Sequence, residues 1–245
     1  MIPIPIIYED NHLLVVEKPQ GIPSQEDETK DADMLTLLKE DLKQRYNKPG
    51  NVYLGLVHRL DRPVGGAMLF AKTSKAASRM SEAVRSRQFD KTYLCVVNGQ
   101  PPAKEAVLVH YLRKDTKRNH VTVFNKPAPE AKEAILEYQV IAIKNNSSLL
   151  AISLHTGRSH QIRAQLAHIG CPLAGDLKYG RQGKSSALST IALWSTSITT
   201  AHPVTKQTMT FQSIPKGIHV FAEWSEDELQ AAATAYLSSI HAEGN

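Results

Sequence analysis

The chain has 245 residues, of which 42% are hydrophobic and 22% are charged, a balance typical of folded globular proteins rather than of disordered chains. No apolar run approaches the roughly 18 residues of a membrane span, and the N-terminal stretch has early acids and no basic leader, which argues against a secretory signal. We therefore expect a cytoplasmic protein that does not enter a membrane. Without apolar repeats or heptads, it is expected to be a monomer.

The cysteines and the charges further limit the classes of protein to which the chain can belong. Cys95 and Cys171 lie in no CxxC or Cys/His spacing, so we expect two reduced structural thiols rather than a disulfide or a zinc site. The formal net charge is +5, and basic residues crowd positions 59–91 and 113–118. A one-sided positive surface would attract RNA, whereas a scattered, solvated surface would not, and composition leaves both open.

The first half of the chain reads as strands interrupted by helices. Short β-branched runs at 4–10 and 13–19 predict strands, and helical spacing over 31–47, with Asp33 as the cap, predicts a helix. Apolar runs at 52–57 and 67–72 predict two more strands, separated by a turn. An Ala-rich helix over 74–89 and a strand over 91–99 follow.

The second half continues the same mixture. The pattern from about 105 to 155 is strands and hairpin loops, and residues 159–170 predict a helix that ends at Gly170 in a left-handed cap. Further strands are predicted near 189–194, 196–201 and 207–213, with a closing helix at 226–240. We therefore predict a single α+β domain over 1–245, built on a large mixed, mainly antiparallel sheet flanked by helices.

Three segments carry polar residues that local structure alone does not require. They are HRLDRPVGG at 58–66, KTYLCVV at 91–97, and a segment dense in Arg, His and Gly at 154–180. In the first of them, Asp61 lies between two arginines directly after an apolar strand. No segment taken alone is strong evidence of function. An ion-paired loop would explain the first, and a core tyrosine would explain the second.

Taken together and in this order, the segments resemble the RluA family of RNA pseudouridine synthases. That family has a first motif HRLDxxTSG, then a KxY segment about thirty residues later, then TGRxHQIR followed by GxPxxGDxxYG. This chain has HRLDRPVGG, KTY, TGRSHQIR and GCPLAGDLKYG. The resemblance implies the family's fold, with an active-site cleft across the sheet, and isomerisation of uridine to pseudouridine in ribosomal or transfer RNA.

The resemblance also implies roles for individual residues. Asp61 matches the catalytic aspartate, and Arg163 matches the arginine that pairs with it, since a neighbouring cation favours an ionised carboxylate. Tyr93 matches the tyrosine that stacks on the target base, and Ile162 the apolar wall opposite. Arg59 matches the arginine that fills the gap left by the flipped uridine.

Other polar residues keep more than one interpretation. His160 is expected to be a supporting hydrogen-bonder near the substrate, and Arg158 either a phosphate contact or part of a structural salt bridge. Asp176 and Tyr179 are expected mainly to shape a turn. A metal site is not expected, because His160 and His168 are eight residues apart rather than the four of a zinc-binding helix.

Neither a nucleotide nor any other cofactor is expected, because the reaction needs no redox partner or group donor, and no glycine-rich nucleotide loop is present. Two departures from the motif, Val64 and Gly65 in place of Thr-Ser, put substrate choice in doubt more than catalysis. The chain also begins almost directly with the catalytic segments, so target selection is expected to rest on its own basic surface.

Two other functions stay open at this point. One is a catalytically silent RNA-binding protein of the same fold, acting as an RNA chaperone or assembly factor. The other is a metal-dependent hydrolase using Asp61 and histidines. The joint presence of Asp61, Tyr93 and Arg163 favours the enzyme over the silent protein. Whether the aspartate attacks the uracil or the ribose is also left open by the sequence.

Overall fold

The computed structural model describes residues 3–180 and 190–243. The chain forms two compact units. The first comprises Met1–Asp90 and Ser197–Ser213, and the second comprises Lys91–Thr196 and Ile214–Asn245.

The first unit is built around β2. Its strands are β1 (Ile6–Glu9), β2 (Leu13–Lys18), β3 (Gly55–Leu56), β4 (Gly65–Ala71), β11 (Thr208–Gln212) and the last part of β10 (Leu193–Ala201). β2 pairs in antiparallel register with β1 on one side and with β4 on the other, and β11 pairs antiparallel with β10. All seven residues of β4 are buried, so it is a central strand of this unit.

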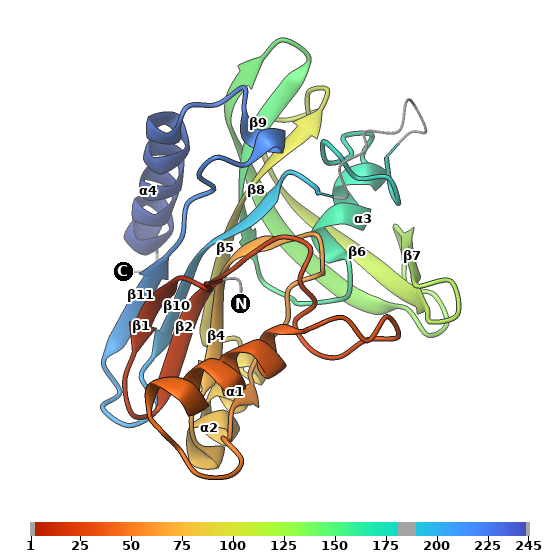
Figure 1. The fold of residues 1–245 in the computed structure, drawn as a ribbon. Helices are drawn as coiled ribbons and strands as arrows, with labels where there is room; N and C mark the ends of the chain where they lie inside the picture. The colour runs from red at the N-terminus through yellow and green to blue at the C-terminus, as the bar shows by residue number, and fades with distance from the viewer. Residues whose placement is uncertain (1–2, 181–189, 244–245) are drawn as a thin grey trace. The chain divides into compact units, whose positions relative to one another are not determined.

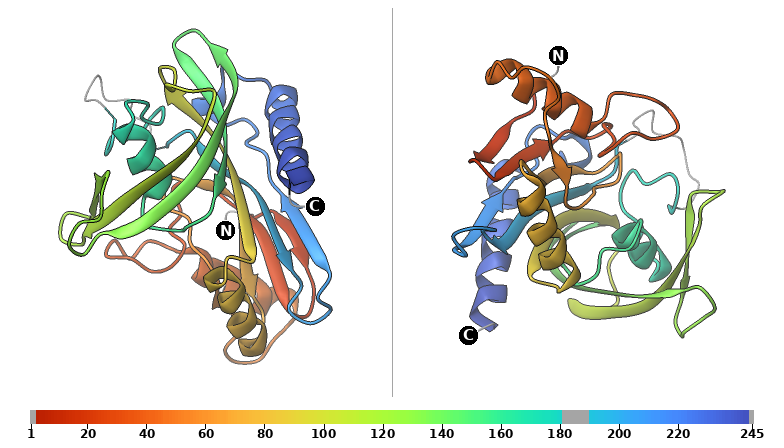
Figure 2. Two further views of the ribbon diagram at one scale, coloured as in Figure 1. Left: turned by 180° about the vertical axis from the view of Figure 1, so that it is seen from behind. Right: turned by 90° about the horizontal axis from the view of Figure 1, so that it is seen from below.

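Two helices complete the first unit. α2 (Ser74–Arg85) contributes Met80 to a cluster that includes Leu13 and Leu69 on one face of the strands. α1 (Met34–Arg45) lies on the other side of the strands (Figure 2). It begins at the predicted cap, because the Asp33 side chain accepts hydrogen bonds from the next N–H groups of the first turn.

The second unit contains the first part of β10 and an antiparallel arrangement of five further strands. These five strands, in the order β5-β9-β8-β6-β7, are β5 (Phe89–Asn98), β9 (Ser147–Leu154), β8 (Lys132–Lys144), β6 (Glu105–Asp115) and β7 (His120–Phe124). A single-turn helix, η1 (His219–Phe221), precedes the last helix, α4 (Glu226–Glu243). The remaining helix, α3 (Gln161–His168), lies beside β6 and β7 (Figure 1).

The register of the strands places α3 and α4 on opposite faces of this sheet. α4 packs on a cluster that includes Leu94 and Ala151, which are paired neighbours on β5 and β9. α3 contributes Ala164 to a cluster with Ala134 on β8. Side chains alternate between the two faces along a strand, and Ala134 lies an odd number of residues from the β8 residue that pairs with Ala151. The Ala134 side chain therefore points to the other face. The sheet is thus covered on both sides.

The prediction of an α+β fold with a mainly antiparallel sheet is confirmed, since every strand pair with a described register is antiparallel. Two details differ. The predicted strand at 52–57 pairs only at Gly55–Leu56, because β4 already has β2 and β10 as neighbours and offers β3 only Phe70 and Ala71. In place of the strands predicted at 189–194 and 196–201 there is one strand, β10, which begins only at Leu193, and residue 189 lies outside the described residues.

Gly170 ends α3 as predicted. Its φ is +86°, the left-handed conformation that L side chains resist, and the N–H of Cys171 returns to the carbonyl of Leu166 at 3.0 Å. No atom lies within 4 Å of a Cβ placed there, so only backbone strain opposes a side chain. We expect Gly170→Ala to lower the free energy of unfolding by about 1 kcal/mol in urea titrations, and Gly170→Asn by less. An unchanged midpoint for the alanine variant would contradict this account of the helix end.

Candidate active site

Asp61 lies in a tight turn of the first unit, directly after the buried residue Leu60. The turn is closed by the Val64 N–H, which donates to the Asp61 carbonyl at 2.9 Å. On the other side, the Ser24 hydroxyl donates to the Leu60 carbonyl at 2.7 Å and accepts from the Leu60 N–H at 3.1 Å. The backbone on both sides of Asp61 is therefore held by hydrogen bonds, while its side chain is half-buried.

Lys18, the last residue of β2, lies beneath this turn. The residue is fully buried, and its ammonium donates to the carbonyls of Pro19, Arg62 and Val64 at 3.0, 3.1 and 2.7 Å. Burial lowers the pKa of Lys18 to about 7, an effect that the charge of Asp61 opposes and that of Arg62 reinforces. Lys18 thus stabilises the backbone of the Asp61 turn through these hydrogen bonds, and its charge interacts with the Asp61 carboxylate.

The two arginines that flank Asp61 in sequence differ in their surroundings. Arg62 donates to the Thr29 hydroxyl at 2.6 Å and to the Asp31 carboxylate at 2.7 Å, so it ties the turn to the 27–31 loop. Arg59 is exposed. The basic sequence around Asp61 therefore does not imply that both arginines serve the same purpose.

In the second unit, Tyr93, Ile162 and Arg163 lie on one side of the sheet. Tyr93 pairs with Ile152, which pairs with Tyr138 on β8. Tyr138 lies an even number of residues from Ala134, which packs under α3, so these side chains share one face of the sheet. Tyr93 therefore points to the face that α3 covers, and α3 carries Ile162 and Arg163. All three residues are buried, with 4 to 6% of the surface of each whole residue exposed.

Arg163 forms a buried ion pair with Asp176. Its Nε donates to Asp176 Oδ2 at 2.7 Å and its Nη2 to Asp176 Oδ1 at 2.9 Å, and the two side chains are 7% and 0% exposed. Asp176 also accepts the N–H groups of Lys178 and Tyr179, so it shapes the turn as the sequence suggested. Its second role, which is to bind Arg163, was not predicted from the sequence.

Tyr179 connects the same turn to His160. The Tyr179 hydroxyl lies 2.8 Å from His160 Nδ1 and accepts the N–H of Val121 at 2.9 Å, and its ring lies 5.3 Å from the guanidinium carbon of Arg163. Arg158 is exposed, and its Nε donates to the backbone carbonyl of Glu133 at 2.9 Å rather than to a carboxylate.

The ion pair makes the free energy of unfolding depend on pH in the acid range. Burial alone would raise the pKa of Asp176, but the hydrogen bonds and charge of Arg163 and two N–H groups outweigh it and hold the pKa below its ordinary 3.8. Because the folded pKa lies below the unfolded one, the stabilisation is complete above about pH 4 and is lost as the pH falls through the folded pKa. We expect the difference in unfolding free energy between wild type and Asp176→Asn to shrink from pH 7 to pH 3 in urea titrations; an unchanged difference would contradict it.

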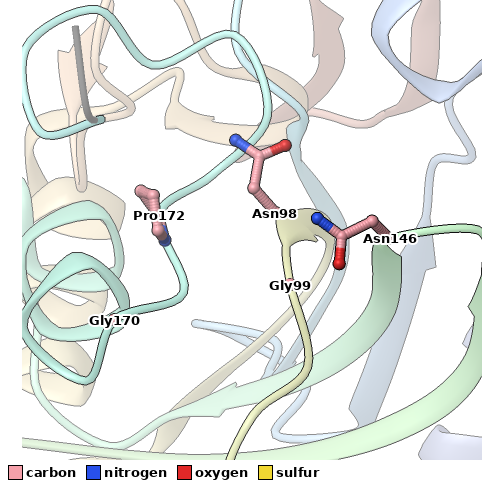
Figure 3. Close-up of a pocket in the computed structure, with 5 residues that line it drawn as sticks. All are labelled: Asn98, Gly99, Asn146, Gly170 and Pro172. Atoms are coloured by element: carbon pink, nitrogen blue, oxygen red, sulfur yellow. The ribbon is translucent and has the colours of Figure 1, made fainter. Parts of the chain in front are cut away.

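A shallow cavity of about 320 Å³ lies elsewhere in the second unit (Figure 3). It is lined by Asn98 at the end of β5, Asn146 in the turn before β9, Gly99, Gly170 and Pro172. None of these residues is an acid, a base or a nucleophile. We therefore do not assign the chemistry of the candidate site to this cavity.

Three further observations concern the described residues, 3–180 and 190–243. Among them, no group of three or more His, Cys, Asp or Glu side chains is arranged to hold a metal ion. Within the same ranges, no helix is long and apolar enough to cross a membrane. Cys95 and Cys171 are both free and buried, as expected of structural thiols, and burial raises the pKa of the Cys95 thiol.

Lys18 was not among the site residues predicted from the sequence, and Asp176 was predicted mainly to shape a turn. A signal for Lys18 was available, because a lysine at the end of the apolar run LLVVEK is either exposed or buried with carbonyl partners. For Asp176, the sequence offered only its place in a turn. Its partner is thirteen residues away along the chain, and nothing in the local pattern indicates that the two side chains meet.

The motif segments and the fold define the class of protein. The family model of RNA pseudouridylate synthase matches residues 12–168, and the chain belongs to this family.

Individual relatives agree with this assignment. An uncharacterised RNA pseudouridine synthase of Bacillus subtilis, YhcT, is 32% identical over 82% of this chain and 65% of its own length. Ribosomal large subunit pseudouridine synthase D of Yersinia pestis is 35% identical over 78% of this chain and 58% of its own length. The chain thus matches less than two thirds of these relatives. Among solved structures, human RNA pseudouridylate synthase domain containing 4 shares the fold, with a TM-score of 0.74 at 21% identity over 89% of this chain and 92% of that one.

Proposed function

We propose that this protein is an RNA pseudouridine synthase that isomerises one or more uridines in structured ribosomal or transfer RNA. The observation that carries the proposal is that the family match, over residues 12–168, contains the HRLD turn, the KTY strand and the HQIR helix in one chain. A relative named for the ribosomal large subunit supports ribosomal RNA as one substrate class.

The proposed reaction is an internal rearrangement. The bond between ribose C1′ and uracil N1 breaks, the uracil turns, and C1′ bonds to C5. The proton on C5 is lost and N1 gains a proton, so atoms and charge balance without an oxidant or a group donor. The protein must therefore supply a carboxylate, a pocket that holds the detached base, and a route for one proton.

We assign these tasks to residues that the family motifs match. Asp61 is the catalytic carboxylate, and its hydrogen-bonded turn supports this, because a fixed backbone limits where the carboxylate can point. Tyr93 and Ile162 bracket the uracil, a role supported by their common face in the second unit. Arg163 is the cationic partner of the reacting groups, and the exposed Arg59 fills the gap in the RNA stack.

The remaining parts of the proposal concern the setting of the reaction. Arg158 is a candidate phosphate contact, supported by its exposure, and His160 supports the substrate site from the start of α3. We propose that residues 1–245 act as one catalytic domain, that the protein acts as a monomer, and that it works in the cytoplasm, where ribosomal and transfer RNA are available. An RNA stem-loop is the proposed partner.

Mapping pseudouridine in cellular RNA tests the proposal. Ribosomal and transfer RNA from cells lacking the protein is treated with a carbodiimide that marks pseudouridine, and the stops in reverse transcription are compared with those of complemented cells. The proposal predicts at least one position that is marked only when the protein is present. If no position in either RNA class differs, the proposed function is wrong.

A further inference from the structure

We propose that Asp176 is a positioning residue, which holds the guanidinium of Arg163 in the one orientation that the reaction requires. This inference rests on the proposed function, because it gives Arg163 its purpose. Asp176 itself touches no reacting atom in this proposal. It acts through Arg163 alone.

The geometry of the pair carries the inference. Two nearly parallel hydrogen bonds, at 2.7 and 2.9 Å, join the Nε and Nη2 of Arg163 to the two oxygens of Asp176. A two-bond contact of this kind determines both the plane and the rotation of the guanidinium, which a single bond would leave variable. With 7% and 0% of the side chains exposed, water does not compete for either bond.

Asp176 is itself held rigidly. Its Oδ1 accepts the N–H groups of Lys178 and Tyr179 at 2.9 and 3.2 Å, and its backbone carbonyl accepts the N–H of Gly180 at 2.8 Å. The preceding Gly175 has a φ of +80°, and a Cβ there would collide with the backbone oxygen of Thr190. The segment thus has little freedom to move relative to its surroundings.

Tyr179 holds the other side of the same arginine. Its ring lies 5.3 Å from the guanidinium carbon of Arg163, within cation–π distance. The Tyr179 hydroxyl accepts the Val121 N–H of β7, so the ring is tied to the sheet. The GDLKYG segment therefore contacts Arg163 through both a carboxylate and an aromatic ring.

This arrangement limits what Arg163 can do. Asp176 occupies the edge of the guanidinium formed by Nε and Nη2, so a further acceptor must approach at the opposite edge, at Nη1 or the remaining N–H of Nη2. Because the carboxylate also cancels most of the positive charge at a distance, Arg163 acts on groups within direct hydrogen-bond reach rather than through a long-range field. Orientation is therefore what Asp176 contributes, and a misplacement of about 1 Å would reduce the rate by about 10²-fold.

The test is a double-mutant cycle on single-turnover pseudouridine formation. It uses the full chain, wild type, Asp176→Asn, Arg163→Met and the double variant, with unfolding free energies measured for each. Asp41→Asn is the matched control, because it removes the same charge from another arginine pair, Arg45–Asp41 at 2.7 Å. Arginine 15Nε NMR gives a readout independent of activity, since the protected Nε–H of Arg163 reports the pair directly.

We expect Asp176→Asn to lower the rate about 10²-fold with little change in KM, to shift or broaden the Arg163 Nε–H signal, and to have almost no further effect once Arg163 is methionine. Asp41→Asn should react like wild type. If wild type is active, Arg163→Met is inactive and Asp176→Asn keeps the full rate, this inference is wrong and the proposed function stands. Equal multiplicative losses in both backgrounds would also overturn it. An inactive wild type would instead refute the proposed function.

Discussion

Replacing Asp61 by asparagine should abolish pseudouridine formation while leaving RNA binding intact. Asparagine has nearly the same shape, so the turn closed by Val64 and held by Ser24 should persist. The amide can neither attack carbon nor take up a proton, and removing a group of this kind costs at least about 10³-fold in rate. The rate is measured under single-turnover conditions by nucleoside chromatography, and binding is measured by filter retention.

A control separates lost chemistry from lost charge. Asp31→Asn removes an exposed carboxylate that pairs with Arg62, the residue next to Asp61, at 2.7 Å. It should change the rate by less than about threefold, because exposed ion pairs contribute little. If Asp61→Asn kept more than about a tenth of the wild-type rate, Asp61 would not be the catalytic carboxylate.

Replacing Lys18 by methionine should destabilise the protein strongly and slow the reaction. The ammonium is fully buried and donates to three backbone carbonyls, two of them in the turn that follows Asp61. Methionine fills similar space but donates nothing, so buried acceptors lose their partner. Relief from burying the charge offsets part of this loss, and the net cost is about 2 to 4 kcal/mol in urea unfolding.

The pH dependence distinguishes the loss of the Lys18 amino group from a poor fit of the methionine side chain. Because the pKa of Lys18 is about 7 in the folded protein, below its ordinary 10.5, the unfolded chain binds more protons between these values. The Lys18 contribution therefore grows as the pH rises from 7 toward 10.5, and the cost of Lys18→Met should be larger at pH 9 than at pH 7. Lys144→Met, which removes an exposed pair with Glu228, a hydrogen bond to the Glu223 carbonyl and a cation–π contact with Trp224, should cost the same at both pH values. A cost for Lys18→Met that falls with pH would contradict this assignment.

Much of the fold could be predicted because its signals are local. The capping of α1 by Asp33 and the end of α3 at Gly170 depend on residues within a few positions of each other. The short pairing of β3 could not be predicted in the same way, because it depends on which edge of β4 remains available. Strand length is decided by the partner rather than by the strand's own sequence.

The same distinction between local signals and distant contacts applies to the candidate site. The identities of Asp61, Tyr93 and Arg163 came from motif segments, and their roles remain proposals. The contacts that surround them came only from the structure, since Lys18 reaches Val64 across 46 positions and Arg163 meets Asp176 across 13. A sequence can indicate which groups carry the chemistry, whereas the groups that orient them are joined through the fold.

Tritium release is the measurement that tests the central claim most directly. RNA labelled with tritium at uridine C5, prepared from cells that lack the protein, is incubated with the purified chain, and the tritium released to water is counted. The account predicts release that depends on the protein and levels off at a small number of sites per RNA molecule. If no RNA class released tritium while salt-sensitive binding to the same RNA persisted, the protein would be an RNA-binding member of the family rather than a synthase.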